Sequence, residues 1–260
     1  MQDLIITLIL GLIVGLLSGV FGVGGSSITT PLLRIFLGTS PLIALASPFP
    51  VAIPVALSGT LVYRQHGLIN LRVVVWTLTG GFPMMILGSV LTRWVPGHWL
   101  MLLVAVSMLV AGWRLISSSP PTEDGTHLRG NNATWQHPPV AALLSVAAIV
   151  GLLSGLLASG GGLFFIPVYV LFFGARLREA AATSLLCVAF LAIPGTITHA
   201  LLGHIDWWLA LQLGIAVVPA TYLGARLSVS LAHIRLRRPF GVFLSVFALY
   251  FFIRELLKAL

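Results

Sequence analysis

The sequence has 260 residues, of which 58% are hydrophobic and 8% are charged, and its formal net charge is +8. Soluble domains carry about 25% charged residues, so this composition excludes an ordinary soluble domain. Long apolar runs recur along the whole chain, and runs of about 17–25 residues are typical of membrane helices. The arginines lie between these runs, as orientation signals do, so the positive charge does not indicate a nucleic-acid partner. We therefore expect an all-α polytopic membrane protein surrounded by the lipid bilayer.

The apolar runs fall into two sets of five predicted helical pieces. The first set lies at 4–21, 27–37, 41–63, 72–92 and 98–116, and the second at 140–157, 163–173, 177–202, 207–225 and 238–254. Residues 117–139 between the sets are polar and rich in turn formers. The sequence therefore predicts a first transmembrane repeat at 1–116, a linker at 117–139 and a second repeat at 140–260, with about 8–10 membrane segments in all.

The two sets are copies of one another. VGLLSGVFGVGG at 14–25 recurs as VGLLSGLLASGG at 150–161, and the offset of 136 gives 23 identities in the 79 positions from Ile13 to Leu91. Eight identities are glycines and two are prolines, so the helix breakers stay in register. A duplicated membrane unit of this kind points toward a transporter.

The second piece of each set is too short to cross a membrane. Eleven residues at a 1.5 Å rise cover about 16 Å, against about 30 Å of hydrocarbon. Glycines join it to the first piece, and they permit a sharp backbone turn. We expect a re-entrant helix pair with a buried glycine tip, followed by three spanning helices.

The arginines favour an inverted arrangement of the two repeats. If the halves are inverted, ten basic residues lie on one side and four on the other, whereas parallel halves give eight and six. Positive charge prefers the cytoplasmic face, so the inverted arrangement is preferred and both termini are expected outside.

The predicted membrane interior contains no carboxylate in the middle of an apolar run. This argues against cation transport, a metal site or a carboxylate proton relay. We expect no catalytic residue, no metal and no cofactor, and hence no enzyme. Helix N-termini with glycines instead bind anions through backbone N–H groups. The candidate residues at the two tips are Gly24, Gly25, Ser26 and Ser27 in the first half and Ser159, Gly160, Gly161 and Gly162 in the second.

Some of these glycines have structural interpretations. Gly15, Gly19, Gly151 and Gly155 have the small-xxx-small spacing of close helix packing, which we favour for them. The tip glycines either contact substrate or only make the turn.

The third piece of each set adds further candidates, because proline frees backbone carbonyls there. Ser47, Thr183, Ser184 and Thr196 either line a cavity or bond back to their own helix. His199, near a helix end, is one of the substrate-binding candidates, and its alternatives are an interfacial hydrogen bonder, which we favour, and a proton carrier. Arg34, in the short second piece, is expected to snorkel to the interface.

Several segments resemble the sulfite exporter TauE/SafE family of membrane permeases. They are GVFGVGGSSITTPLL and GLLASGGGLFFIPVY at the tips, and AAATSLL, GTITHALLGHIDWWLAL and YLGARLS within 180–228. The resemblance implies movement of sulfite, thiosulfate or organosulfonates across the bacterial inner membrane. Ser26, Ser27 and ALASPFP depart from the family pattern in the first half, which bears on the exact substrate.

The expected function is therefore an anion permease that works by alternating access. Transport of another small anion such as a carboxylate, and a non-transporting accessory subunit, are the alternatives. A small anionic substrate is the expected partner, and a homodimer is one assembly to consider.

Overall fold

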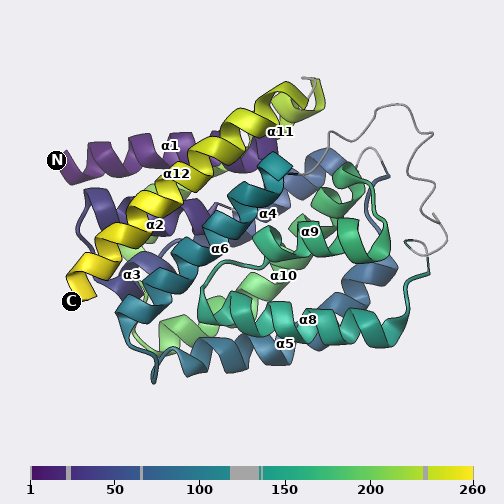
Figure 1. The fold of residues 1–260 in the computed structure, drawn as a ribbon, viewed down its shortest axis with the longest axis horizontal. Helices are drawn as coiled ribbons and strands as arrows, with labels where there is room; N and C mark the ends of the chain where they lie inside the picture. The colour runs from purple at the N-terminus through teal and green to yellow at the C-terminus, as the bar shows by residue number, and fades with distance from the viewer. Residues whose placement is uncertain are drawn as a thin grey trace.

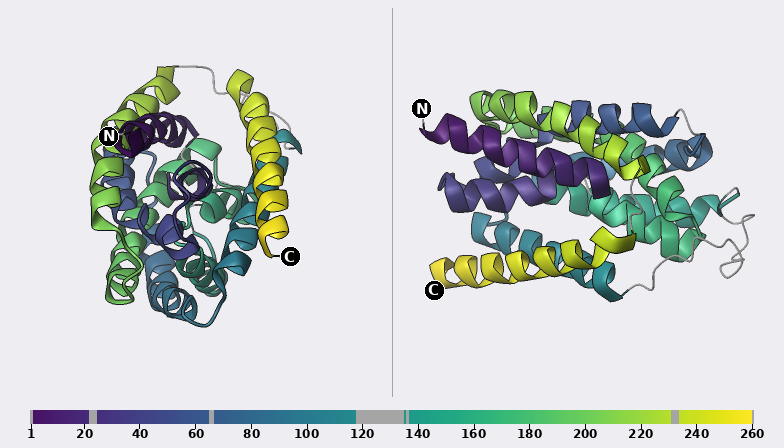
Figure 2. Two further views of the ribbon diagram at one scale, coloured as in Figure 1. Left: turned by 90° about the vertical axis from the view of Figure 1, so that its left-hand side faces the viewer. Right: turned by 90° about the horizontal axis from the view of Figure 1, so that it is seen from above.

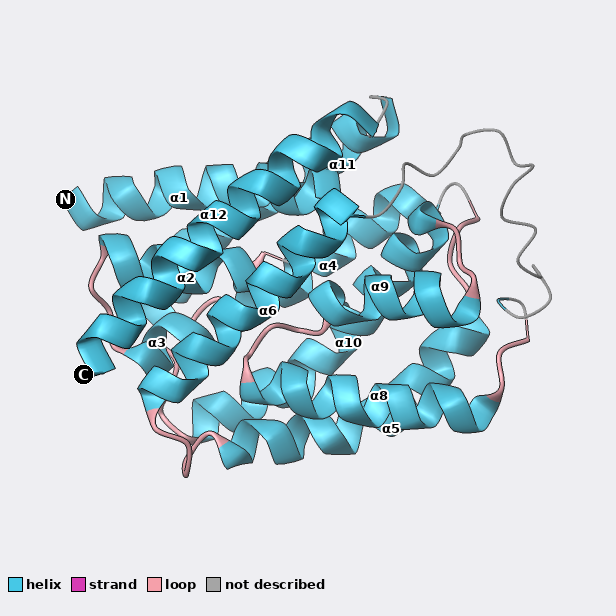
Figure 3. Ribbon diagram, viewed as in Figure 1, coloured by secondary structure: helices cyan, strands magenta, loops and turns pink. Residues whose placement is uncertain are grey.

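The computed structural model describes residues 2–21, 25–64, 67–117, 135, 137–230 and 234–259, and these residues contain helices and no strand (Figure 3). The helices of the first half are α1 (Gln2–Phe21), α2 (Ser26–Phe36), α3 (Pro41–Ala46), α4 (Phe49–Arg64), α5 (Leu71–Leu91) and α6 (Gly97–Ser117). Those of the second half are α8 (Val140–Leu156), α9 (Gly162–Phe173), α10 (Leu177–Leu201), α11 (Trp207–Ser230) and α12 (Ile234–Ala259). The all-helical prediction is confirmed for this part of the chain. The predicted linker lies largely outside the described residues, so the repeat boundaries stay predictions.

Five of the described helical segments are long and apolar enough to cross a membrane. They are Pro41–Arg64, Leu71–Leu91, Gly97–Arg114, Arg178–Leu201 and Trp207–Leu227, and shorter apolar helices lie at Leu4–Val20, Val140–Leu156 and Gly162–Phe173. The helices run mostly along the long axis of the molecule, and both termini lie at the same end of it (Figures 1 and 2). The chain is a multi-pass membrane protein.

The predicted helical piece at 41–63 is divided in the structure. α3 ends at Ala46 and α4 begins at Phe49, with Ser47 and Pro48 between them. Ser47 keeps helical backbone angles (φ −61°, ψ −33°), but Pro48 and Pro50 have no backbone N–H to donate, which explains the break in the helix at this dipeptide. The corresponding helix of the second half, α10, is continuous over 25 residues. The two halves therefore differ at this position.

The first helix of each half packs closely against a helix of the other half, α1 against α11 and α8 against α5. A Cβ atom on Gly15 of α1 would lie 2.6 Å from Ala220 Cβ of α11, and one on Gly151 of α8 would lie 2.6 Å from the Gly81 carbonyl oxygen of α5. Only glycine permits such a close approach, so the packing interpretation of these glycines is confirmed.

The α1–α11 and α5–α8 contacts repeat with the sequence offset of 136. Gly19 meets the carbonyl of Thr221, while Gly155 meets the carbonyl of Met85, and each of these residues is 136 positions from its counterpart. The duplication is therefore preserved in the contacts between helices and not only in the sequence.

The last helices of the two halves, α6 and α12, lie side by side and run in opposite directions. α12 ends where the C-terminus is marked in Figure 1, whereas α6 begins near that end of the molecule. Gly112 of α6 permits the close approach, because a Cβ there would lie 3.0 Å from the Gly241 carbonyl oxygen of α12.

Candidate functional site

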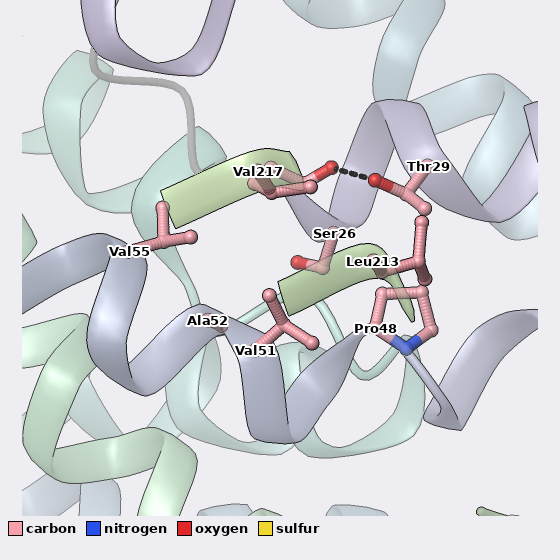
Figure 4. Close-up of a pocket in the computed structure, with 9 residues that line it drawn as sticks. Ser26, Thr29, Pro48, Val51, Ala52, Val55, Leu213 and Val217 are labelled. Carbon is pink, nitrogen blue, oxygen red and sulfur yellow. Dashed lines mark hydrogen bonds between the residues drawn. The ribbon is translucent and has the colours of Figure 1, made fainter. Parts of the chain in front are cut away.

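A small cavity lies beside the first glycine tip, at the beginning of α2. Its lining comes from three helices and contains Gly25, Ser26, Thr29, Pro48, Val51, Ala52, Val55, Leu213 and Val217 (Figure 4). The cavity measures about 10 Å³, which is about the space that one water molecule needs. The side chains thus close around the site and leave no room for a larger ligand in this conformation.

The start of one helix, α2, lies at this cavity. α2 begins at Ser26, whereas near the lining residue Pro48 the helix α3 ends at Ala46 and α4 begins at Phe49, where Pro48 and Pro50 have no backbone N–H. The first-turn amides of a helix have no acceptor within the helix, and the N-terminus carries roughly half a positive charge. The cavity is therefore suited to a negatively charged group, although its lining contains no Lys, Arg or His.

Hydroxyl groups surround the first tip, and some have no hydrogen-bond partner among the described residues. Thr29 Oγ1 donates to the Gly25 carbonyl at 2.7 Å, and Thr30 Oγ1 donates to the Ser26 carbonyl at 3.0 Å. Ser26 Oγ and Ser27 Oγ are buried without a partner within the described structure. Buried polar groups are rarely left unpaired, so these hydroxyls are available to a ligand or to water. Gly24, the fourth candidate at this tip, lies outside the described residues.

The second tip has left-handed backbone at two glycines. Gly160 and Gly161 have φ values of 66° and 87°, in the left-handed region that favours glycine, whereas Gly25 has a φ of −59°. Ser159 Oγ is buried and lacks a partner among the described residues. Gly162 begins α9 and is buried. At Gly160 and Gly161 the backbone conformation itself accounts for glycine.

An aromatic side chain occupies one of the second-half positions that correspond to the cavity wall. Thr29 of the cavity corresponds to Phe165, and the Phe165 ring lies 2.5 Å from the position that a Cβ on Gly161 would take. Tyr169 stacks on Phe165 with a centroid distance of 5.6 Å. The Tyr169 hydroxyl lies 2.8 Å from Thr77 Oγ1 and 3.6 Å from Cys187 Sγ. The described residues thus place the tip cavity in the first half and a packed aromatic group in the equivalent part of the second.

Ser47 and Thr183 form a matched pair of hydrogen bonds between the halves. Ser47 Oγ accepts from the Asp206 backbone N–H at 3.0 Å, and Thr183 Oγ1 accepts from the Asn70 backbone N–H at 3.1 Å. The first bond holds the residue before α11 against the junction of α3 and α4, and the second holds the residue before α5 against α10. These hydroxyls therefore have a structural role, whether or not they also contact substrate.

The remaining candidates lie on α10. Ser184 Oγ is buried and donates to the Ala181 carbonyl at 3.1 Å, whereas Thr196 Oγ1 is buried without a partner among the described residues. His199 is fully buried, with Nε2 at 3.2 Å from the Gly155 carbonyl and Nδ1 at 3.3 Å from His204 Nδ1. Since a carbonyl only accepts, Nε2 carries the proton in that bond. None of these three side chains lines the tip cavity.

The structure adds residues that the sequence interpretation missed. Thr29 and the apolar wall residues of the cavity were not candidates, because apolar residues in a membrane helix carry no signal of their own. Arg34 does not snorkel freely: its Nε and Nη2 bond Glu255 Oε1 at 3.1 Å and Oε2 at 3.3 Å, while Nη1 donates to the Thr39 carbonyl at 2.9 Å. Glu255 lies near the C-terminus and was not a candidate in the sequence, but it is only 1% exposed.

The fold and the duplicated tips agree with one known family. The family model for the sulfite exporter TauE/SafE matches residues 7–251. The chain belongs to the sulfite exporter TauE/SafE family. The match covers both halves and both glycine tips, so the site lies within the family's shared region.

Curated relatives are similar along almost their whole length. The probable membrane transporter protein YunE of Bacillus subtilis (strain 168) is 26% identical over 246 residues, which cover 88% of this chain and 89% of that protein. A probable membrane transporter protein of Xylella fastidiosa (strain Temecula1) is 28% identical over 260 residues, 96% of this chain and 95% of that protein. No solved structure matches the chain significantly. The chain is thus a membrane transporter of this family, and a bacterial inner-membrane location fits these relatives.

Proposed function

We propose that the protein is a permease that moves small sulfur-containing anions, such as sulfite, thiosulfate or an organosulfonate, across the bacterial inner membrane. The observation that carries this proposal is the cavity at the start of α2, beside the hydroxyl of Ser26, which has no partner within the described structure. Sulfur oxoanions present several acceptor oxygens, which suit backbone amides and hydroxyl donors. The family match supports the substrate class.

The lining of the cavity favours a weakly held anion over a tightly held one. The N-terminus of α2 and the hydroxyls supply the attraction, and the remaining wall is apolar, from Val51, Val55, Leu213 and Val217. A charged lysine or arginine in the wall would bind an anion strongly and slow its release. A site made of dipoles suits a carrier, which must both bind and release its substrate.

Alternating access by two inverted halves is the mechanism we propose. The 136-residue offset in the contacts between α1 and α11 and between α5 and α8, and the opposite directions of α6 and α12, support the inverted relation. In such carriers one half rocks against the other around a site at the repeat interface. The cavity of about 10 Å³ is too small for an anion and has to widen for one to enter.

Flux measurements on the purified protein in proteoliposomes test the proposal. Sulfite, thiosulfate, methanesulfonate and acetate are supplied separately, with and without a pH gradient. Ser26→Ala should lower the flux of the sulfur anion roughly tenfold, since a hydrogen bond to a charged group contributes about 1.5–3 kcal/mol. Ser145→Ala is the matched control, because Ser145 is an exposed hydroxyl that bonds only the Ala141 carbonyl of its own helix among the described contacts.

The possible results separate the alternatives. Flux of acetate without flux of the sulfur anions would replace the sulfur-anion proposal by a carboxylate carrier. Absence of flux for every anion would favour an accessory subunit. Equal flux in the Ser26→Ala protein and the unmodified protein would contradict the location of the site.

A further inference from the structure

Phe49 lies between the first and the second glycine tip. It is the first residue of α4, and its side chain is fully buried. The neighbouring residues Pro48 and Ala52 line the cavity at the first tip. The ring itself points to the second half, where its Cε2 lies 3.8 Å from the position of a Cβ on Gly160. The first turn of α4 thus contacts the cavity on one side and the second tip on the other.

The Phe49 ring packs directly against the backbone of α10 at Gly195. A Cβ atom on Gly195 would overlap the ring, with Cε1 as the nearest atom and Cζ at 2.7 Å. The ring also makes an edge contact with His199, at a centroid distance of 5.9 Å and an interplanar angle of 75°. Glycine at position 195 therefore makes the space in which this ring lies.

Unpartnered hydroxyls adjoin both glycines that the ring contacts. Ser159 precedes Gly160 and Thr196 follows Gly195, and neither hydroxyl has a hydrogen-bond partner within the described structure. Both residues are buried or half-buried. The apolar Phe49 ring thus contacts the two glycines next to these hydroxyls, while its neighbours Pro48 and Ala52 line the cavity that contains Ser26.

The second half has a leucine in the position that corresponds to Phe49. Leu185 is 136 residues after Phe49, and its Cδ1 lies 3.0 Å from the position of a Cβ on Gly59, the counterpart of Gly195. The same contact is therefore made twice, once with a rigid ring and once with a flexible aliphatic chain. The aromatic member is the one that adjoins the cavity.

We propose that Phe49 is a gate between two subsites for the transported anion. The first subsite is the cavity at Ser26, and the second is formed by the hydroxyls of Ser159 and Thr196 around Gly160. The anion passes from one to the other when the ring moves away from Gly195. The size of the opening that the ring leaves sets the largest anion that crosses. This inference rests on the proposed anion transport and adds the residue that limits substrate size.

Flux of sulfonates of increasing size tests the gate. Sulfite, methanesulfonate and benzenesulfonate are compared in proteoliposomes that contain the unmodified protein, Phe49→Ala, Phe49→Leu or the matched control Leu185→Ala. The benzenesulfonate-to-sulfite flux ratio should rise about tenfold in Phe49→Ala and less in Phe49→Leu, and should not change in Leu185→Ala. Phe49→Leu keeps an apolar side chain, so it serves as the measurement if the alanine variant does not fold.

A suppressor experiment tests the same contact without depending on substrate size. Gly195→Ala should reduce sulfite flux at least tenfold, because its methyl group overlaps the ring, and Phe49→Leu in the same chain should restore most of that flux. Gly59→Ala should have a smaller effect, since the flexible Leu185 side chain can move. An unchanged flux ratio in both Phe49 variants, an equal change in Leu185→Ala, or no rescue of Gly195→Ala would overturn the gate. Absence of anion flux in the unmodified protein would instead contradict the proposed function.

Discussion

The ion pair between Arg34 and Glu255 links the short helix α2 to the C-terminal helix α12. Replacing either residue should destabilise the protein, and the two replacements should lower the free energy of unfolding by different amounts. The Glu255 side chain is 1% exposed, whereas that of Arg34 is 16% exposed and also donates to the Thr39 carbonyl. Removal of one partner from a buried pair costs about 3–5 kcal/mol, because a buried charge is left without compensation. Arg34→Met leaves Glu255 with only the more distant Lys258 Nζ at 4.0 Å among its recorded ion-pair partners.

We expect Arg34→Met to lower the free energy of unfolding by about 3 kcal/mol or more, and Glu255→Met by about 1–2 kcal/mol, because Arg34 is closer to solvent. The double variant should lie within about 1 kcal/mol of the unmodified protein, since both charges are gone and the apolar side chains pack in their place. Equilibrium unfolding in mixtures of dodecyl maltoside and SDS, followed by tryptophan fluorescence, measures all three values.

Arg93→Met is the matched control for this cycle. Arg93 is exposed and its guanidinium carbon lies 5.8 Å from the centre of the Trp94 ring, so its replacement should change the free energy of unfolding by no more than about 0.5 kcal/mol. Additive effects of Arg34→Met and Glu255→Met, or a larger cost for Glu255→Met, would refute the reasoning.

Two further predictions concern the second tip and the loop after α10. Gly161→Ala should destabilise the fold more than Gly25→Ala in the same unfolding assay. Gly161 has a φ of 87° and its added Cβ would meet Phe165, whereas the nearest atom to a Cβ on Gly25 is 3.5 Å away. A larger loss of unfolding free energy in Gly25→Ala would contradict this prediction. Burial lowers the pKa of His204 from its usual value of 6.5, so the fold favours the neutral ring. Stability should therefore be constant above about pH 6.5 and fall as the pH decreases below it, since the unfolded chain binds the proton more readily. Unfolding curves at pH 5 to 8 should show a weaker pH dependence for His204→Asn, and an unchanged dependence would disprove the assignment.

Much of the architecture follows from the glycine pattern. Glycines and prolines in register at an offset of 136 predict a duplication, and the contacts of Gly19 and Gly155 repeat at that offset. The short pieces at 27–37 and 163–173 correspond closely to α2 and α9. These features are readable because glycine and helix length impose local constraints that do not depend on the rest of the fold.

The partners of each helix could not be predicted in this way. Apolar residues on membrane helices contact lipid or protein with little difference in composition, so the pattern does not identify α11 as the partner of α1. The Arg34–Glu255 pair joins residues 221 positions apart, and a single charge near a chain end gives no sign of its burial. Pairing of this kind is decided by three-dimensional packing alone.

The asymmetry of the two tips was visible in the sequence, but its consequence was not. Thr29 aligns with Phe165, and Pro48 aligns with Ser184. These differences leave a cavity and a helix break in the first half, and an aromatic group and a continuous helix in the second. Whether a smaller side chain leaves a cavity depends on the helices packed around it, and the sequence alone does not identify those helices.

The close packing of the first helix of each half against a helix of the other half has a consequence for the assembly of the protein. α1 has its close glycine contact on α11, and α8 has its own on α5, so neither half contains the partner of its own first helix. When the ribosome has completed the first half of the chain, the glycines of α1 therefore still lack the helix against which they pack. These contacts can form only once α8 and α11 of the second half have been made, so the two halves complete one another as the subunits of a dimer do, although a single chain encodes both.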